Sequence, residues 1–269
     1  MIFNMKCSHP VVAGTFYPDD PKTLRRLLNT YLAAAQDKRN LPIPKAIIAP
    51  HAGYIYSGPI AASAYACLTR ATYIKTAVIL APSHRIYFSG IAALTNDAYL
   101  TPLGPIAIDQ EKIKTIVDLP YINTDGRLFN QEHALEVQLP FLQTVLPQTK
   151  IVPLLIGDAM SEQVANVLQI LWNGRETLII VSSDLSHYLD YHHAQVLDNQ
   201  TKNAILSFNA TAITEDAACG RIAIAGLILV TAAKKMYATA IDLRNSGDTA
   251  GAHDAVVGYG AFHFGEKHG

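Results

Sequence analysis

The sequence predicts a single α/β domain with a mostly parallel central sheet and helices on both of its faces. Short apolar runs rich in β-branched residues alternate with longer stretches in which apolar residues recur at helical spacing. The 269 residues are 50% hydrophobic and 16% charged, and no repeat or Ser/Gly-rich linker interrupts them. This composition excludes a disordered or collagenous chain, and we expect one domain over residues 1–269.

Four short apolar runs are expected to be strands that are buried on both faces, as strands of parallel sheets are. They lie at residues 45–49, 76–81, 150–156 and 177–181. A last apolar run at 255–264 is expected to close or edge the sheet. Pro102 and Gly104 predict a surface turn over 99–105.

Between the predicted strands, apolar residues recur three and four positions apart, which is typical of helices that pack one face against a sheet. The predicted helices cover residues 21–35, 59–68, 109–117, 132–145, 161–172 and 192–208. Asp20 followed by Pro21 is a typical start for the first of them. The apolar stretch at 222–233 is too short to cross a bilayer and predicts a buried helix.

Charge and cysteine content narrow the classes of function. Lys+Arg 21 nearly balances Asp+Glu 22 and like charges form no long block, so we expect no nucleic-acid partner. We find no secretory signal and no membrane span, so we expect no membrane partner. Three scattered cysteines indicate a reducing compartment, and we expect a cytoplasmic protein.

Three of the predicted strands are each followed by a histidine, namely His51, His84 and His187. Because ligands gather outside the carboxyl ends of parallel strands, we expect these imidazoles to converge. Two histidines and one carboxylate suit non-haem Fe(II), and imidazole also binds Zn and Cu. Alternatively, each histidine bonds a backbone carbonyl at its strand end. The repeated position favours a metal or acid–base site.

A second polar group is expected on the predicted helix 132–145, where His133 and Glu136 share a face. In one interpretation His133 donates a proton and Glu136 orients the His133 ring. In the other, the two residues belong to a solvated polar stripe. Asp184, Glu136 and Asp248 are the candidate carboxylates for the strand-end site. Neither H-E-x-x-H nor G-x-S-x-G occurs, which argues against a zincin and against the usual nucleophile elbow.

Several ordered motifs carry a resemblance to a known family. They occupy residues 9–18, 50–54, 56–58, 82–84, 132–140 and 182–188, with Cys219-Gly220 and residues 257–259 as further matches. Over nearly the whole chain this set resembles the Memo family, the protein B component of the AmmeMemoRadiSam system. The family itself is similar to class III extradiol ring-cleaving dioxygenases.

The resemblance implies an α/β fold with a metal pocket in which His51 and His84 are ligands and His187 is the acid–base residue. It places Asp184 and His133 in the pocket lining, and it implies a radical-SAM protein and an AMMECR-type protein as partners. The third ligand looks to be a cysteine in animal members of the family and a carboxylate in the dioxygenases. Segment 244–251 holds no thiol, so Asp248 is the expected ligand. The alternative is a turn residue whose carboxylate bonds nearby backbone N–H groups.

We therefore expect a metal-dependent, dioxygenase-like oxidoreductase that acts on a small organic substrate. Its metal would be Fe(II), with Cu or Zn as alternatives, held by His51, His84 and Asp248. Its catalytic residues would be His187, His133 and Asp184. Two alternatives stay open, a non-catalytic module that binds metal or peptide and a metal-assisted hydrolase.

Overall fold

The computed structural model describes residues 5–266. A mixed sheet runs through the middle of the molecule, with strand order β10-β12-β2-β9-β3-β8-β4-β7. Its four central strands pair in parallel with one another and are buried. They are β2 (Ala46–Ala49), β9 (Thr177–Ser182), β3 (Thr76–Pro82) and β8 (Lys150–Ile156). These are the four strands predicted from the short apolar runs.

Antiparallel strands flank the four parallel ones, so the sheet is mixed around a parallel centre. On one side β12 (Val256–Gly265) pairs antiparallel with β2, and both β10 (His187–Leu189) and β11 (Tyr237–Asn245) pair antiparallel with β12. The run at 255–264 thus forms an interior strand and not an edge. On the other side β4 (Ile91–Ala93) pairs antiparallel with β8 and parallel with β7 (Ile122–Asn123).

A smaller sheet consists of β1 (Cys7–Ser8), β5 (Ala98–Thr101) and β6 (Gly104–Ala107). The surface turn predicted over 99–105 is in fact the β5–β6 hairpin, with the turn confined to its tip between Thr101 and Gly104. Gly104 has a φ of +111°, a conformation that favours glycine, while Tyr99 is buried.

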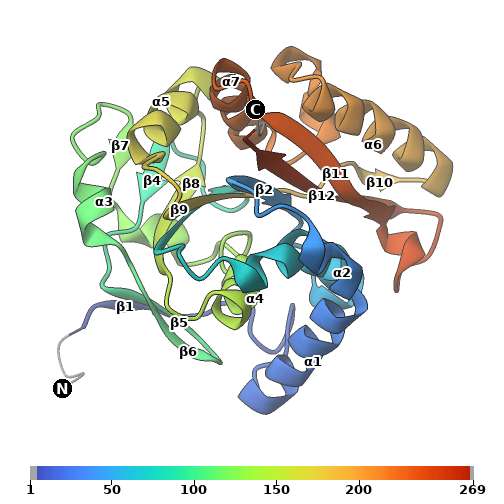
Figure 1. Ribbon diagram of the computed structural model, residues 1–269, viewed down its shortest axis with the longest axis horizontal. Coiled ribbons are helices and arrows are strands. Elements are labelled where there is room, and N and C mark those ends of the chain that lie inside the picture. The colour runs from blue at the N-terminus through green and yellow to red at the C-terminus, as the bar shows by residue number, and fades with distance from the viewer. Residues whose placement is uncertain (1–4, 267–269) are drawn as a thin grey trace.

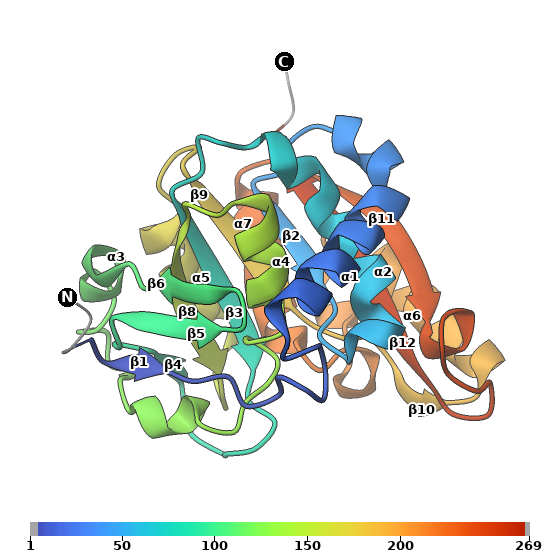
Figure 2. The ribbon, with the colours of Figure 1, turned by 90° about the horizontal axis from the view of Figure 1, so that it is seen from below.

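Helices cover both faces of the large sheet (Figures 1 and 2). One face carries α1 (Pro21–Ala34), α2 (Tyr54–Tyr65) and α4 (Gln138–Val145). The other carries α5 (Ser161–Leu171), α6 (Tyr191–Leu206) and α7 (Arg221–Ala233). The short helix α3 (Gln110–Lys114) lies beside β8. One hydrophobic cluster joins both helix layers to the sheet, which confirms the α/β class.

The first helix shows how local sequence produces these elements. Asp20 caps α1 by accepting a hydrogen bond from the Thr23 backbone N–H at 2.8 Å. Leu24, Leu28 and Leu32 lie four residues apart on one face and are buried. Capping and apolar spacing therefore agree with the prediction for 21–35.

The predicted helix over 132–145 is wrong in its first part, because α4 begins only at Gln138. Glu132 instead bonds with its side chain to the backbone N–H groups of His84 and Ala134, which fixes a turn at this point. A side chain that bonds nearby backbone groups competes with helix formation. His133 and Glu136 consequently do not share a helix face.

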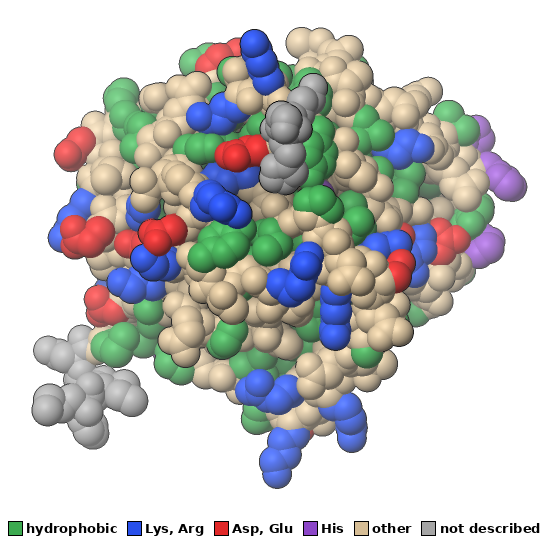
Figure 3. All heavy atoms as spheres, viewed as in Figure 1, with side chains coloured by type: hydrophobic (Ala, Val, Ile, Leu, Met, Phe, Trp, Pro, Cys, Tyr) green, Lys and Arg blue, Asp and Glu red, His purple; other side chains and the backbone are tan. Residues whose placement is uncertain are grey.

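On the face shown in Figure 3, Lys and Arg side chains are interspersed with Asp and Glu over the upper part, whereas the lower part, where α1 lies, carries mostly Lys and Arg. Between residues 5 and 266, every helix is too short or too polar to span a membrane.

Candidate metal centre

Histidines from separate segments converge at the carboxyl ends of the central strands. His51 follows β2 and His84 follows β3, and their ring centroids lie 5.2 Å apart. His133, in the turn before α4, stacks on His84 at 4.9 Å and lies edge-on to His51 at 5.5 Å. The parallel pairing of β2, β9 and β3 places these strand ends side by side, as the sequence predicts.

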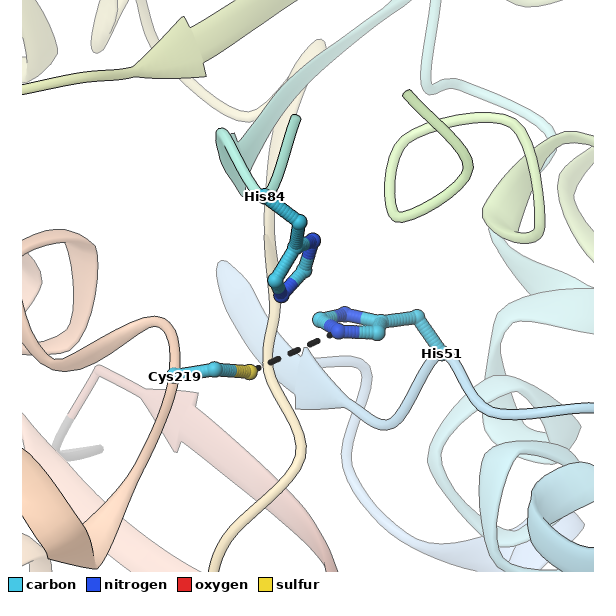
Figure 4. A group of neighbouring side chains, drawn as sticks. All are labelled: His51, His84 and Cys219. Atoms are coloured by element: carbon cyan, nitrogen blue, oxygen red, sulfur yellow. Dashed lines mark hydrogen bonds between the residues drawn. The ribbon is translucent and has the colours of Figure 1, made fainter. Parts of the chain in front are cut away.

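The third member of the group is a cysteine. One ligand atom each from His51, His84 and Cys219 lie within 4.8 Å of one another. The Cys219 Sγ is 3.4 Å from His51 Nε2, and Figure 4 shows the sulfur and both rings pointing toward a common centre. Two imidazoles and a thiol are an ordinary ligand set for a transition metal.

Close packing of the segment before α7 puts Cys219 in this place. The Gly220 N–H donates to Ser183 Oγ at 2.9 Å, and a Cβ on Gly220 would lie only 2.7 Å from Ser183 Cβ. The backbone N–H of Asp184 lies 3.3 Å from the Cys219 sulfur. A glycine after the cysteine therefore lets this segment approach the end of β9 closely enough to reach the histidines.

Glu132 orients His84. Its Oε1 lies 3.0 Å from His84 Nδ1, and its Oε2 accepts the His84 backbone N–H at 2.6 Å. Burial alone would raise the pKa of Glu132, but hydrogen bonds from His84 and from the Ala134 N–H lower it to about 2. The ionised carboxylate accepts the proton of Nδ1, so His84 presents Nε2 to the cluster.

His51 is held at two points. Its backbone N–H donates to Asp184 Oδ1 at 2.8 Å, and its Nδ1 lies 2.9 Å from Ser182 Oγ. Burial and, to a smaller extent, the neighbouring His84 lower the pKa of His51 to about 3. The ring is therefore neutral at physiological pH, the form in which imidazole binds a metal.

Asp248 does not take part in this group. It is exposed on a single turn of 3-10 helix (Ser246–Asp248), where Oδ1 accepts from Tyr191 OH at 2.6 Å and Oδ2 accepts the Asn245 N–H at 2.8 Å. These are the local bonds of a turn residue, the alternative that the Ser-Gly-Asp-Thr sequence left open. We therefore replace Asp248 with Cys219 in the candidate ligand set.

Asp184 lies in the polar lining of the cluster, next to His51 and Cys219. Asp184 Oδ2 is 4.0 Å from His51 Nε2, and burial raises the pKa of this carboxyl. Asp184 thus contacts His51 and Cys219, and among residues 5–266 no hydrogen bond links it to His187. His187 is half-buried on β10, close enough for its charge to act on the pKa of both His51 and Asp184.

Glu136 anchors the N-terminal segment instead of orienting His133. Its buried carboxylate accepts from Tyr17 OH at 2.5 Å and from the backbone N–H groups of Val11 and Val12 at 2.6 and 3.1 Å. The same segment places Phe16 edge-on against His133, with ring centroids 4.8 Å apart. Segment 11–17 therefore packs against one side of the histidine cluster.

His133 is left as a neutral ring beside the ligands. Burial lowers its pKa to about 4, and the neighbouring His51 contributes. Its buried Nδ1 lies 3.3 Å from Glu132 Oε1 without hydrogen-bond geometry. The ring is therefore neutral at physiological pH.

A cavity of about 300 Å³ adjoins the cluster at Cys219. Its wall is mixed, with Ile86, Phe88 and Ile222 as apolar lining residues and Asp158, Glu215 and Arg221 as charged ones. This volume falls at the lower end of the range for small-molecule sites.

Sequence reasoning missed Cys219, Glu132 and Ser182 as parts of the site. Cys219-Gly220 is among the family-like motifs, which is a signal for Cys219, but the sequence analysis considers only the carboxylates Asp184, Glu136 and Asp248 as the third ligand. No sequence spacing links Glu132 to His84 or Ser182 to His51. These contacts join residues 48 and 131 positions apart, and only the sheet topology brings them together.

Comparisons with known proteins agree with the resemblance. The family model for Memo-like protein matches residues 8–263. A MEMO1 family protein of Aquifex aeolicus is 35% identical over 95% of this chain and 98% of its own length, and one of Archaeoglobus fulgidus is 36% identical with the same coverage. The crystal structure of the uncharacterized protein JW3007 from Escherichia coli K12 covers 81% of this chain and 99% of that chain, with a TM-score of 0.46 and 12% identity. On the family match and these identities, the chain belongs to the Memo family.

Proposed function

We propose that this protein binds one transition-metal ion through His51, His84 and Cys219 and uses it to act on a small organic molecule. The observation that carries the proposal is the convergence of the three ligand atoms within 4.8 Å. Both histidines have their Nδ1 engaged by Ser182 and Glu132, so that Nε2 is left for the ion.

The donor set fits borderline and soft ions. Imidazole suits iron, copper and zinc, whereas a thiolate favours Cu(I) and zinc over hard ions. With Cys219 in place of a carboxylate, the ligand set no longer favours Fe(II) over the softer ions. Burial raises the pKa of the Cys219 thiol to about 12, so an entering ion must displace its proton.

When bound, such an ion would supply Lewis acidity to a substrate oxygen or, if it is redox-active, exchange electrons. The protein's own residues would do the remaining work. His133, neutral against His84, is placed to accept a proton, and His187 at the border of the cluster is a second proton carrier. The cavity beside Cys219 would hold a small molecule with both apolar and polar groups, since Ile86 and Phe88 line it together with the charged Asp158, Glu215 and Arg221.

Metal analysis tests this proposal most simply. The protein would be purified anaerobically and its iron, copper and zinc content measured, followed by oxygen consumption with small aromatic and aliphatic compounds. We expect close to one ion per chain in the wild type and in His192→Ala, which removes an exposed histidine, and a loss in His84→Ala. Substrate-dependent oxygen uptake would support an oxidoreductase, and bound metal without turnover would support a metal-binding module. Equal metal content in all three proteins would contradict the site.

A further inference from the structure

We propose that Ser182 and Gln138 are positioning residues that fix the proton of His51 on Nδ1 before a metal arrives. The Nε2 lone pair of His51 then faces Cys219 in the metal-free protein. The inference rests on the metal site proposed above. It follows from counting donors and acceptors in a chain of buried side chains that runs from Tyr65 to His51.

The Ser182 hydroxyl has a single proton to donate. Ser182 Oγ lies 2.6 Å from the backbone oxygen of Ala134. A carbonyl oxygen only accepts hydrogen bonds, so the hydroxyl proton must lie on this contact. Every other close polar neighbour of Ser182 Oγ must therefore donate to it.

The neighbours of Gln138 determine the orientation of its side-chain amide. Its Nε2 is 2.9 Å from the backbone oxygen of Pro50, which only accepts, and its Oε1 is 2.8 Å from Tyr65 OH. The amide nitrogen thus lies on the Pro50 side, and the phenol donates to Oε1. The same Nε2 lies 2.8 Å from Ser182 Oγ and uses its second proton there.

The position of the His51 proton follows from these two assignments. Ser182 Oγ has donated its proton to Ala134 and accepted one from Gln138, so it has one acceptor position left. His51 Nδ1, at 2.9 Å, fills that position and must carry a proton. In a neutral imidazole the other nitrogen is then a bare acceptor, and this Nε2 lies 3.4 Å from the Cys219 sulfur.

Burial makes the arrangement unambiguous. Tyr65, Gln138, Ser182 and His51 are all buried, with at most 2% of each residue exposed. Water therefore has no access to exchange these partners, and the ring cannot turn over without leaving a buried donor or acceptor unpaired. The ligand atom of His51 is selected by residues that never contact the ion.

Nitrogen NMR of the metal-free protein tests the proton position directly. The protein would be labelled with 15N-histidine and stripped of metal with a chelator, and the His51 signals would be assigned from a His51→Gln variant. We expect a protonated Nδ1 and an unprotonated Nε2 in the wild type. Ser182→Ala should populate the opposite tautomer and weaken Zn(II) binding by about 10- to 100-fold, as loss of an outer-shell partner does.

Two further variants separate positioning from packing. Ser186→Ala removes the hydroxyl of another buried serine four residues along, which makes no hydrogen bond to the site histidines, and should leave the tautomer and Zn(II) affinity unchanged. Ser182→Thr keeps the hydroxyl and should restore both. If Ser182→Ala does not fold, the wild-type spectrum and the near-isosteric Ser182→Cys, which should shift the tautomer partly, still decide the question.

The inference and the proposed function fail in different ways. A wild-type His51 that carries its proton on Nε2, or a Ser182→Ala variant with unchanged tautomer and affinity, would overturn the inference even if metal binds. A wild type that has the expected tautomer but binds no iron, copper or zinc would overturn the proposed function alone.

Discussion

Glu132 holds both the ring and the backbone of His84, with Oε1 3.0 Å from Nδ1 and Oε2 2.6 Å from the backbone nitrogen. A metal-binding histidine usually donates its second ring N–H to such a partner. The loop after β3 and the turn before α4 are thus joined by one carboxylate at the cluster.

We predict that Glu132→Ala weakens Zn(II) binding by about 10- to 100-fold, because His84 loses the partner that orients its ring. Titration calorimetry on the metal-free protein would measure the change. Glu162→Ala removes an exposed carboxylate at the start of α5 and is the matched control. An affinity equal to that of the control would mean that Glu132 does not position the ligand.

Glu136→Gln should loosen the N-terminal segment without removing the metal. The carboxylate accepts three hydrogen bonds, from Tyr17 OH and from the backbone N–H groups of Val11 and Val12. The glutamine side chain would replace one of its oxygens with an NH2 group, a donor that would face these donors. The loss of a buried hydrogen bond costs on the order of 1–3 kcal/mol. Hydrogen exchange should show faster exchange over 11–17 at unchanged metal content. Unchanged protection there would show that other contacts hold the segment.

The stability of the protein should fall in mild acid through His263. This residue is buried on β12 with Nε2 2.9 Å from the Ala64 carbonyl oxygen, and burial lowers its pKa from 6.5 to about 4. Because the folded state binds this proton more weakly than the unfolded chain, the stabilisation is complete above pH 6.5 and is lost as the pH falls toward 4. The difference corresponds to on the order of 3 kcal/mol.

Urea unfolding of the wild type and His263→Gln at several pH values would isolate this contribution, since His51 and His133 titrate in both proteins. The free energy of unfolding of the variant should decline less between pH 6.5 and 4. Parallel curves would show that His263 is not the group responsible.

His187→Ala should keep the metal and lose turnover, by about 10²- to 10⁴-fold, once a substrate is found. The residue begins β10 and lies outside the group of converging ligand atoms. Metal content and rate would be measured on the same preparation. Loss of the ion from a folded variant would reassign His187 as a ligand.

The sequence was sufficient to predict the central strands and the convergence of His51 and His84. Buried parallel strands are short and almost wholly apolar, so β2, β3, β8 and β9 stand out, and the rule that sites gather at strand ends then places the histidines. The antiparallel strands were harder to recognise. The long strand β11 is half-buried and contains Asp242 and Arg244, so it lacks a clear apolar pattern.

The third ligand and the supporting residues could not be derived in the same way. Cys219 precedes a helix rather than following a strand, and its approach depends on the packing of Gly220 against Ser183. Similarly, Glu132 has helix-like surroundings in sequence, and only its bonds to His84 and Ala134 explain why the helix starts later. Contacts between segments distant in sequence determine these positions, and local sequence patterns do not predict such contacts.

The metal content of Cys219→Ala beside that of Asp248→Ala tests the proposed ligand set most sharply, with each variant purified anaerobically and checked for folding. Cys219→Ala should lose most of its metal, because one of three converging ligands is gone. Asp248→Ala should retain the wild-type amount, since its carboxylate bonds Tyr191 and Asn245 away from the cluster. Metal retained in Cys219→Ala and lost in Asp248→Ala would contradict the site described here.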